Sequence, residues 1–137
     1  MKTAVPAAVG RLLIATLFLA SGLGKLAAPA MTIGYIASVG LPFPTLGYAA
    51  AVAIEVGGSL FLLAGFQART VAIVMAVFTL ATAVAFHSDF SDQNQMIHFL
   101  KNVALAGGLL QVVAFGPGLF SLDARRSVRP SSAVPTA

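Results

Sequence analysis

The chain has 137 residues, of which 58% are hydrophobic and only 9% are charged, whereas a soluble domain usually carries about 25% charged residues. The length fits one compact unit, and the charge deficit indicates that most of it faces lipid or other apolar helices. A nucleic-acid-binding role is excluded because the basic residues behind the net charge of +4 are scattered singly, and the lack of cysteine excludes disulfides, thiolate nucleophiles and cysteine-ligated iron–sulfur clusters.

Four apolar runs follow one another along the chain, each about long enough to cross a bilayer as a helix. They cover residues 7–28, 46–66, 70–86 and 99–115. Backbone groups in lipid must be satisfied internally, and no strand-like alternation occurs, so the sequence predicts helices. The predicted fold class is all-α: an integral membrane four-helix bundle at residues 1–126, followed by a disordered tail at 127–137.

The segment between the first two spans, residues 29–44, is predicted to form a short helix in the membrane interface. Its prolines and glycines rule out one continuous helix, yet much of it is apolar. We expect Tyr35 to lie there at headgroup level. The N-terminal span resembles a signal peptide, but Lys25, just after its apolar part, argues against cleavage.

The loops carry basic residues unequally, which predicts the orientation of the chain. Six basic residues fall on one side and two on the other: Lys2, Arg11, Arg69, Arg125, Arg126 and Arg129 against Lys25 and Lys101. We therefore expect a multi-pass membrane protein with both termini cytoplasmic. Arg11 is expected to snorkel, its stem following span one to the cytoplasmic headgroups.

Glu55 is the most informative single residue, because it lies alone in the uncharged run of span two. A carboxylate at mid-bilayer depth costs about 2.5–3.5 kcal/mol and needs a partner, a proton or a water-filled cavity. Lys101 and Lys25 are the expected partners. Small residues beside Glu55 and in span four allow helices to approach closely enough for such a pair.

We predict that four residues converge on one ligand-binding or proton-relay pocket in the outer half of the membrane: Lys25, Glu55, His98 and Lys101. His98 and Lys101 are three residues apart and share a helical face. The alternative is a closed structural ion pair that fixes helix register. Secondary candidates are His87, Asn102 and Tyr35, and catalytic residues stay unassigned.

A metal site is not expected. His87, Asp89, Asp92 and His98 gather around the loop between spans three and four. However, the spacing of eleven between the two histidines matches no compact ligand motif. These histidines are better explained as side chains that mark where the spans meet water.

An ordered set of short motifs resembles the DoxX family of small four-span membrane proteins, over residues 11–123. The motifs are Arg11 with Phe18, Ser21-Gly22-x-x-Lys25, Tyr35-x-x-x-x-Gly40-x-Pro42, Glu55-x-Gly57-Gly58, Gly65 with Arg69, His87, His98-x-x-Lys101-Asn102, Gly107-Gly108, Gly118 and Ser121-Leu122-Asp123. The family takes its name from a subunit associated with thiosulfate:quinone oxidoreductase. Other members are implicated in membrane redox or oxidative-stress assemblies.

The resemblance implies a protein of the bacterial inner membrane that is a subunit or partner of a quinone-linked redox system or of an oxidative-stress system. Quinone is then the expected ligand, and redox proteins are the expected partners. The polar residues would then bind a quinone headgroup or relay protons. Two alternatives come from other classes. One is a proton-coupled permease, which with four spans would need to form a homo-oligomer, and the other is a purely structural membrane adaptor.

Overall fold

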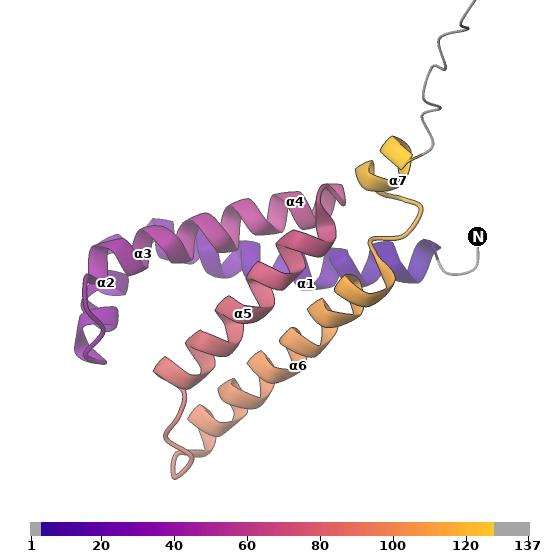
Figure 1. Cartoon of the computed structure of the whole chain (residues 1–137). Coiled ribbons are helices and arrows are strands. Elements are labelled where there is room, and N and C mark those ends of the chain that lie inside the picture. The colour runs from indigo at the N-terminus through magenta and orange to yellow at the C-terminus, as the bar shows by residue number, and fades with distance from the viewer. Residues whose placement is uncertain (1–3, 128–137) are drawn as a thin grey trace, which may run out of the picture.

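The computed structural model describes residues 4–127, and these are almost entirely helical (Figure 1). Four helices are long and apolar enough to cross a membrane. They are α1 (Ala4–Ala27), the composite helix α3–η1–α4 (Pro44–Val52, Ala53–Gly57 and Gly58–Ala64), α5 (Ala68–Phe86) and α6 (Gln93–Phe115). The predicted all-α fold with four spans is confirmed.

Two boundaries differ from the sequence-based spans. Helix α1 begins at Ala4 rather than at residue 7, with Pro6 in its first turn, where a missing N–H is harmless. Helix α6 begins at Gln93, six residues before the apolar run. Its start is fixed by Asp92, whose carboxylate accepts hydrogen bonds from the backbone N–H groups of Asn94 and Gln95.

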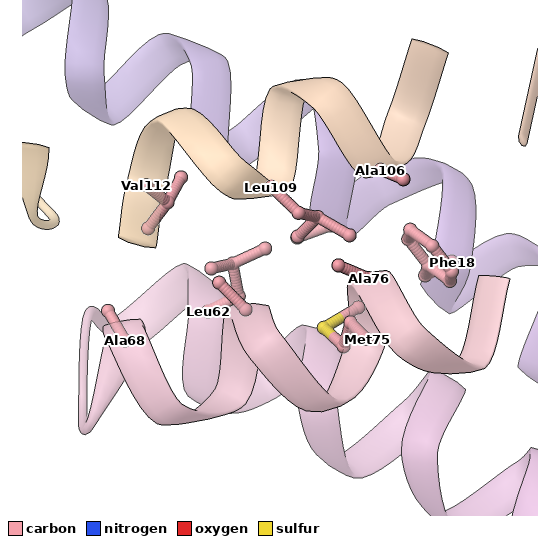
Figure 2. Close-up of a cluster of buried hydrophobic side chains, with 10 residues drawn as sticks. Phe18, Leu62, Ala68, Met75, Ala76, Ala106, Leu109 and Val112 are labelled. Carbon is pink, nitrogen blue, oxygen red and sulfur yellow. The ribbon is translucent and has the colours of Figure 1, made fainter. Parts of the chain in front are cut away.

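The helices pack as two pairs. Helix α1 lies along the composite helix, while α5 lies along α6 and crosses the first pair at an angle (Figure 1). The core forms where the pairs meet, around Leu62 of α4, Met75 of α5 and Leu109 of α6 (Figure 2). These three side chains are fully buried among small alanines, so the helices approach closely.

The expected short helix between the first two spans is present as α2 (Pro29–Ser38). It folds back at the end of the bundle where α1 ends and α3 begins (Figure 1). Tyr35 is about half exposed, and its ring stacks on Phe86 at the end of α5, with centroids 5.3 Å apart. The short helix therefore bridges from the first helix pair to the second.

Arg11 corrects one expectation, because it does not snorkel. The residue is only 2% exposed. Its Nη1 donates to the carbonyl oxygens of Leu62 at 2.8 Å and Leu63 at 3.1 Å, and its Nη2 donates to the carbonyl of Phe120. The last carbonyls of a helix have no intrahelical partner and carry partial negative charge, so the end of α4 attracts the guanidinium inward.

The chain after α6 folds back onto this end of the bundle. Helix α7 (Leu122–Ser127) follows a turn, and Asp123 at its start accepts hydrogen bonds from the backbone N–H groups of Gln67 and Ala68 at 2.8 and 2.9 Å. That contact caps α5. The predicted tail at 127–137 thus begins with the last residue of α7, and residues 128–137 lie outside those described.

Candidate functional site

Glu55 lies in a π-helical turn, η1 (Ala53–Gly57), set within the second span. Such single π turns inside α-helices are often found at functional sites. Glu55 is 6% exposed, so its carboxylate is largely removed from water. The hydroxyl of Ser59 donates to the backbone carbonyl of Glu55, which also accepts from the backbone N–H of Gly58.

Lys25 is the partner of Glu55. Its Nζ lies 2.8 Å from Oε2 and 3.0 Å from Oε1 of the carboxylate, and it also donates to Ser21 Oγ at 2.8 Å. The predicted charge pairing inside the bundle is therefore confirmed, with Lys25 as the cation. Lys101 is exposed and makes no ion pair within residues 4–127.

The close approach of α1 to η1 makes this pair possible. A Cβ placed on Gly22 would lie 2.7 Å from Val56 Cγ2 and 3.1 Å from Glu55 Cβ, so only glycine fits there. Lys25 is one helical turn further along the same face of α1. The missing side chain at position 22 brings the two helix backbones together, and the pair spans the remaining distance.

His98 and Lys101 do not join Lys25 and Glu55. The ring of His98 stacks on that of His87, with centroids 5.0 Å apart, and His87 Nδ1 is 2.7 Å from Gln95 Oε1. Helix α6 meets α1 near Gly108, whose added Cβ would touch Ile14. The N-terminal half of α6 lies along α5 (Figure 1), and Lys101 is exposed there.

A pocket of about 850 Å³ lies where the two helix pairs diverge. Its polar lining includes Lys25 and Glu55 together with all three secondary candidates, His87, Asn102 and Tyr35, whereas His98 and Lys101 are not among its lining residues. The walls are otherwise largely apolar, contributed by α1, α2, α3, α5 and α6. Its volume lies within the roughly 300–1,000 Å³ typical of small-molecule sites.

Sequence reasoning missed the hydroxyl groups that α5 contributes to this pocket. Thr79 and Thr82 both line it, and the Thr82 hydroxyl donates to the Thr79 carbonyl at 2.9 Å. The available signal was their spacing of three residues, which places two polar side chains on one face of an otherwise apolar span.

The sequence matches the family model described as DoxX over residues 7–88. The chain belongs to the DoxX family. The match covers more than half of this DoxX protein and includes Lys25, Glu55 and His87, while His98 and Lys101 follow it in the chain. Four candidate spans and this family membership make it a membrane protein that sits in a lipid bilayer.

Two relatives from Escherichia coli K12 resemble this DoxX protein over most of its length. The inner membrane protein YqjF is 39% identical over 115 residues, which cover 84% of this chain and 87% of the relative. The inner membrane protein YphA is 36% identical over 123 residues, or 85% and 87% of the two chains. The protein is accordingly a DoxX-family inner membrane protein. No solved structure matches it.

Proposed function

We propose that the pocket beside the Lys25–Glu55 pair binds the headgroup of a lipid-soluble quinone, and that the protein is a membrane subunit or partner of a quinone-linked redox or oxidative-stress system. One observation carries the proposal: within residues 4–127, one ion pair with a buried carboxylate faces a pocket of about 850 Å³ with largely apolar walls. Ligand sites typically combine apolar walls with a few placed polar groups of this kind.

The chemistry of the pair suits such a ligand. Ionisable groups inside membrane spans are costly, and they commonly mark ligand or proton pathways. Glu55 would exchange protons with the bound headgroup, and Lys25 would hold the carboxylate in place between exchanges. The π turn that carries Glu55 supports a functional role, because an unbroken α-helix would suffice for a structural ion pair.

The lining residues also support access to the pocket from the bilayer. It is walled by α2 and by the diverging ends of α1 and α5, and each of these helices exposes large apolar side chains such as Met31, Leu23 and Val84. A ligand dissolved in lipid would therefore pass between apolar surfaces to reach the ion pair. A water-soluble substrate would gain nothing from such a route.

Mild purification into lipid nanodiscs followed by solvent extraction and mass spectrometry tests the proposal. We expect the wild-type protein to retain quinone. The Ala85→Phe variant, whose added ring fills the pocket, should retain at least fivefold less quinone. The matched control is Val84→Phe, because Val84 is the preceding residue of α5, is 63% exposed and is not a lining residue. Retention equal in both variants, or absent from the wild type, would overturn the proposal.

Further experiments discriminate the alternatives. Substrate uptake by reconstituted vesicles that depends on a proton gradient would indicate a permease instead. Undiminished cellular function of a Lys25→Met/Glu55→Gln double variant would indicate a structural adaptor, because the pair would then serve packing alone. Redox proteins that co-purify with the wild type would identify the partners.

A further inference from the structure

The hydrogen-bond inventory of the ion pair restricts what the pocket can bind. A lysine ammonium has three N–H donors and no acceptor. All three donors of Lys25 are committed, because its Nζ contacts Glu55 Oε1, Glu55 Oε2 and Ser21 Oγ at 3.0, 2.8 and 2.8 Å. Lys25 therefore has no donor left for a carbonyl oxygen of a ligand.

The Glu55 carboxylate, in contrast to Lys25, has hydrogen-bonding positions that are not used. A carboxylate offers about four lone-pair positions on its two oxygens. Lys25 uses one position on each oxygen, and within residues 4–127 no other group donates to this carboxylate. The residue is 6% exposed and lines the pocket, so a pocket ligand is the natural source of another donor. Both oxygens already have Lys25 as a partner, and each keeps a lone pair that can accept a hydrogen from an occupant of the pocket.

We infer that the pocket selects a hydroxyl-bearing headgroup, a phenol or quinol, whose O–H donates to the Glu55 carboxylate, over the carbonyl form of the same ring. The inference rests on the proposed function and names its ligand more closely. Ser21 accepts from Lys25 and keeps its own hydrogen, so it can donate to a ligand carbonyl. That donor is neutral, whereas a hydroxyl bound to a carboxylate forms a charge-assisted bond roughly twice as strong.

The remaining polar groups of the pocket do not reverse this preference. Asn102 carries both donors and an acceptor on its amide, and the hydroxyls of Tyr35 and Thr79 can serve as either, so these groups accommodate a hydroxyl or a carbonyl oxygen equally well. The hydroxyls of Thr32 and Thr82 already donate to the carbonyls of Ala28 and Thr79, and His87 Nδ1 is engaged with Gln95 Oε1. The discrimination between the two forms therefore falls on the Glu55 carboxylate, which can only accept.

Three matched probes test the inference on the wild-type protein in nanodiscs, with empty nanodiscs as the correction for partition into lipid. They are decyl-hydroquinone under anaerobic conditions, its dimethyl ether, and decyl-benzoquinone. We expect the hydroquinone to bind about tenfold more tightly than either of the others, since both lack the O–H donor, and tenfold corresponds to about 1.4 kcal/mol. In Glu55→Gln the preference should fall to about twofold, because the amide oxygen is a neutral acceptor.

The outcomes separate the two proposals. If none of the probes binds above the empty nanodiscs, the proposed quinone site fails together with this inference. If the benzoquinone or the dimethyl ether binds as tightly as the hydroquinone, the pocket stands and the assignment of a donor ligand is overturned. The wild-type comparison decides this by itself, even where Glu55→Gln does not fold.

Discussion

The Lys25–Glu55 pair is the feature on which the candidate site depends. Two charges in an apolar interior are each costly, and their contact offsets the cost only while both are present. The geometry is favourable, since one ammonium reaches both carboxylate oxygens at 3.0 Å or less. Lys101, the other cation considered, is exposed and has no such role in the fold.

Neutralising one member of this pair should therefore destabilise the protein more than neutralising both. We expect Glu55→Gln or Lys25→Met to cost about 3–5 kcal/mol of unfolding free energy, and the double variant to cost less than the sum. Denaturant unfolding in detergent micelles measures the cycle. Lys101→Met is the control and should stay within about 0.5 kcal/mol of wild type. Strict additivity of the two single changes would contradict the pairing.

At the scale of the elements, close contact between α1 and the composite helix positions the site. Without a hydrophobic driving force between helices in lipid, association depends on packing, and small residues permit close approach. Gly22 provides that approach beside Glu55. Gly58 plays the same part toward α5, because an added Cβ would lie 3.0 Å from Met75 Sδ.

Gly22→Ala is expected to push α1 away from η1 and to destabilise the fold by about 1–3 kcal/mol, as overpacking generally does. Gly24→Ala is the matched control on the same helix, since nothing lies within 4 Å of its added Cβ. That change should be neutral or slightly stabilising, because alanine favours helix over glycine by about 1 kcal/mol. Equal melting temperatures for the two variants would show that the approach at Gly22 is not close.

At the scale of the whole molecule, the two ends of the bundle differ. One end gathers Arg11, Arg69 and the basic residues of α7 around the ends of α4 and α6, where Arg69 Nη1 donates to the carbonyl of Val113 at 2.8 Å. The other end holds the pocket, α2 and the loop between α5 and α6. The excess of basic residues at the first end predicts that it faces the cytoplasm.

Single cysteines can test this orientation directly, because the natural chain has none. Ser91→Cys, in the exposed loop between α5 and α6, should react with an impermeant maleimide in intact spheroplasts. Ser127→Cys, at the end of α7, should react only after the membrane is opened. The reverse labelling pattern would contradict the predicted orientation and would show that the pocket end faces the cytoplasm.

The sequence was sufficient for the number of spans, the short helix α2 and the pairing of Glu55, because each follows from span length, proline position or the cost of a buried charge. The sequence was not sufficient to choose between Lys25 and Lys101, since that choice depends on how α6 crosses α1. It was also not sufficient to predict the inward path of Arg11, because the partners of Arg11 are backbone carbonyls, which every residue has. The start of α6 was readable from Asp92, a helix-capping residue overlooked beside the apolar run.

The buried guanidinium of Arg11 also imposes an order on biosynthesis. Arg11 lies on α1, whereas one of its three carbonyl partners, Phe120, is made 109 residues later. Until then its cation is short of acceptors in a segment that water reaches poorly. The nascent chain therefore cannot complete this end of the bundle helix by helix; it closes only when the last part of the described chain has been translated and has folded back onto the first.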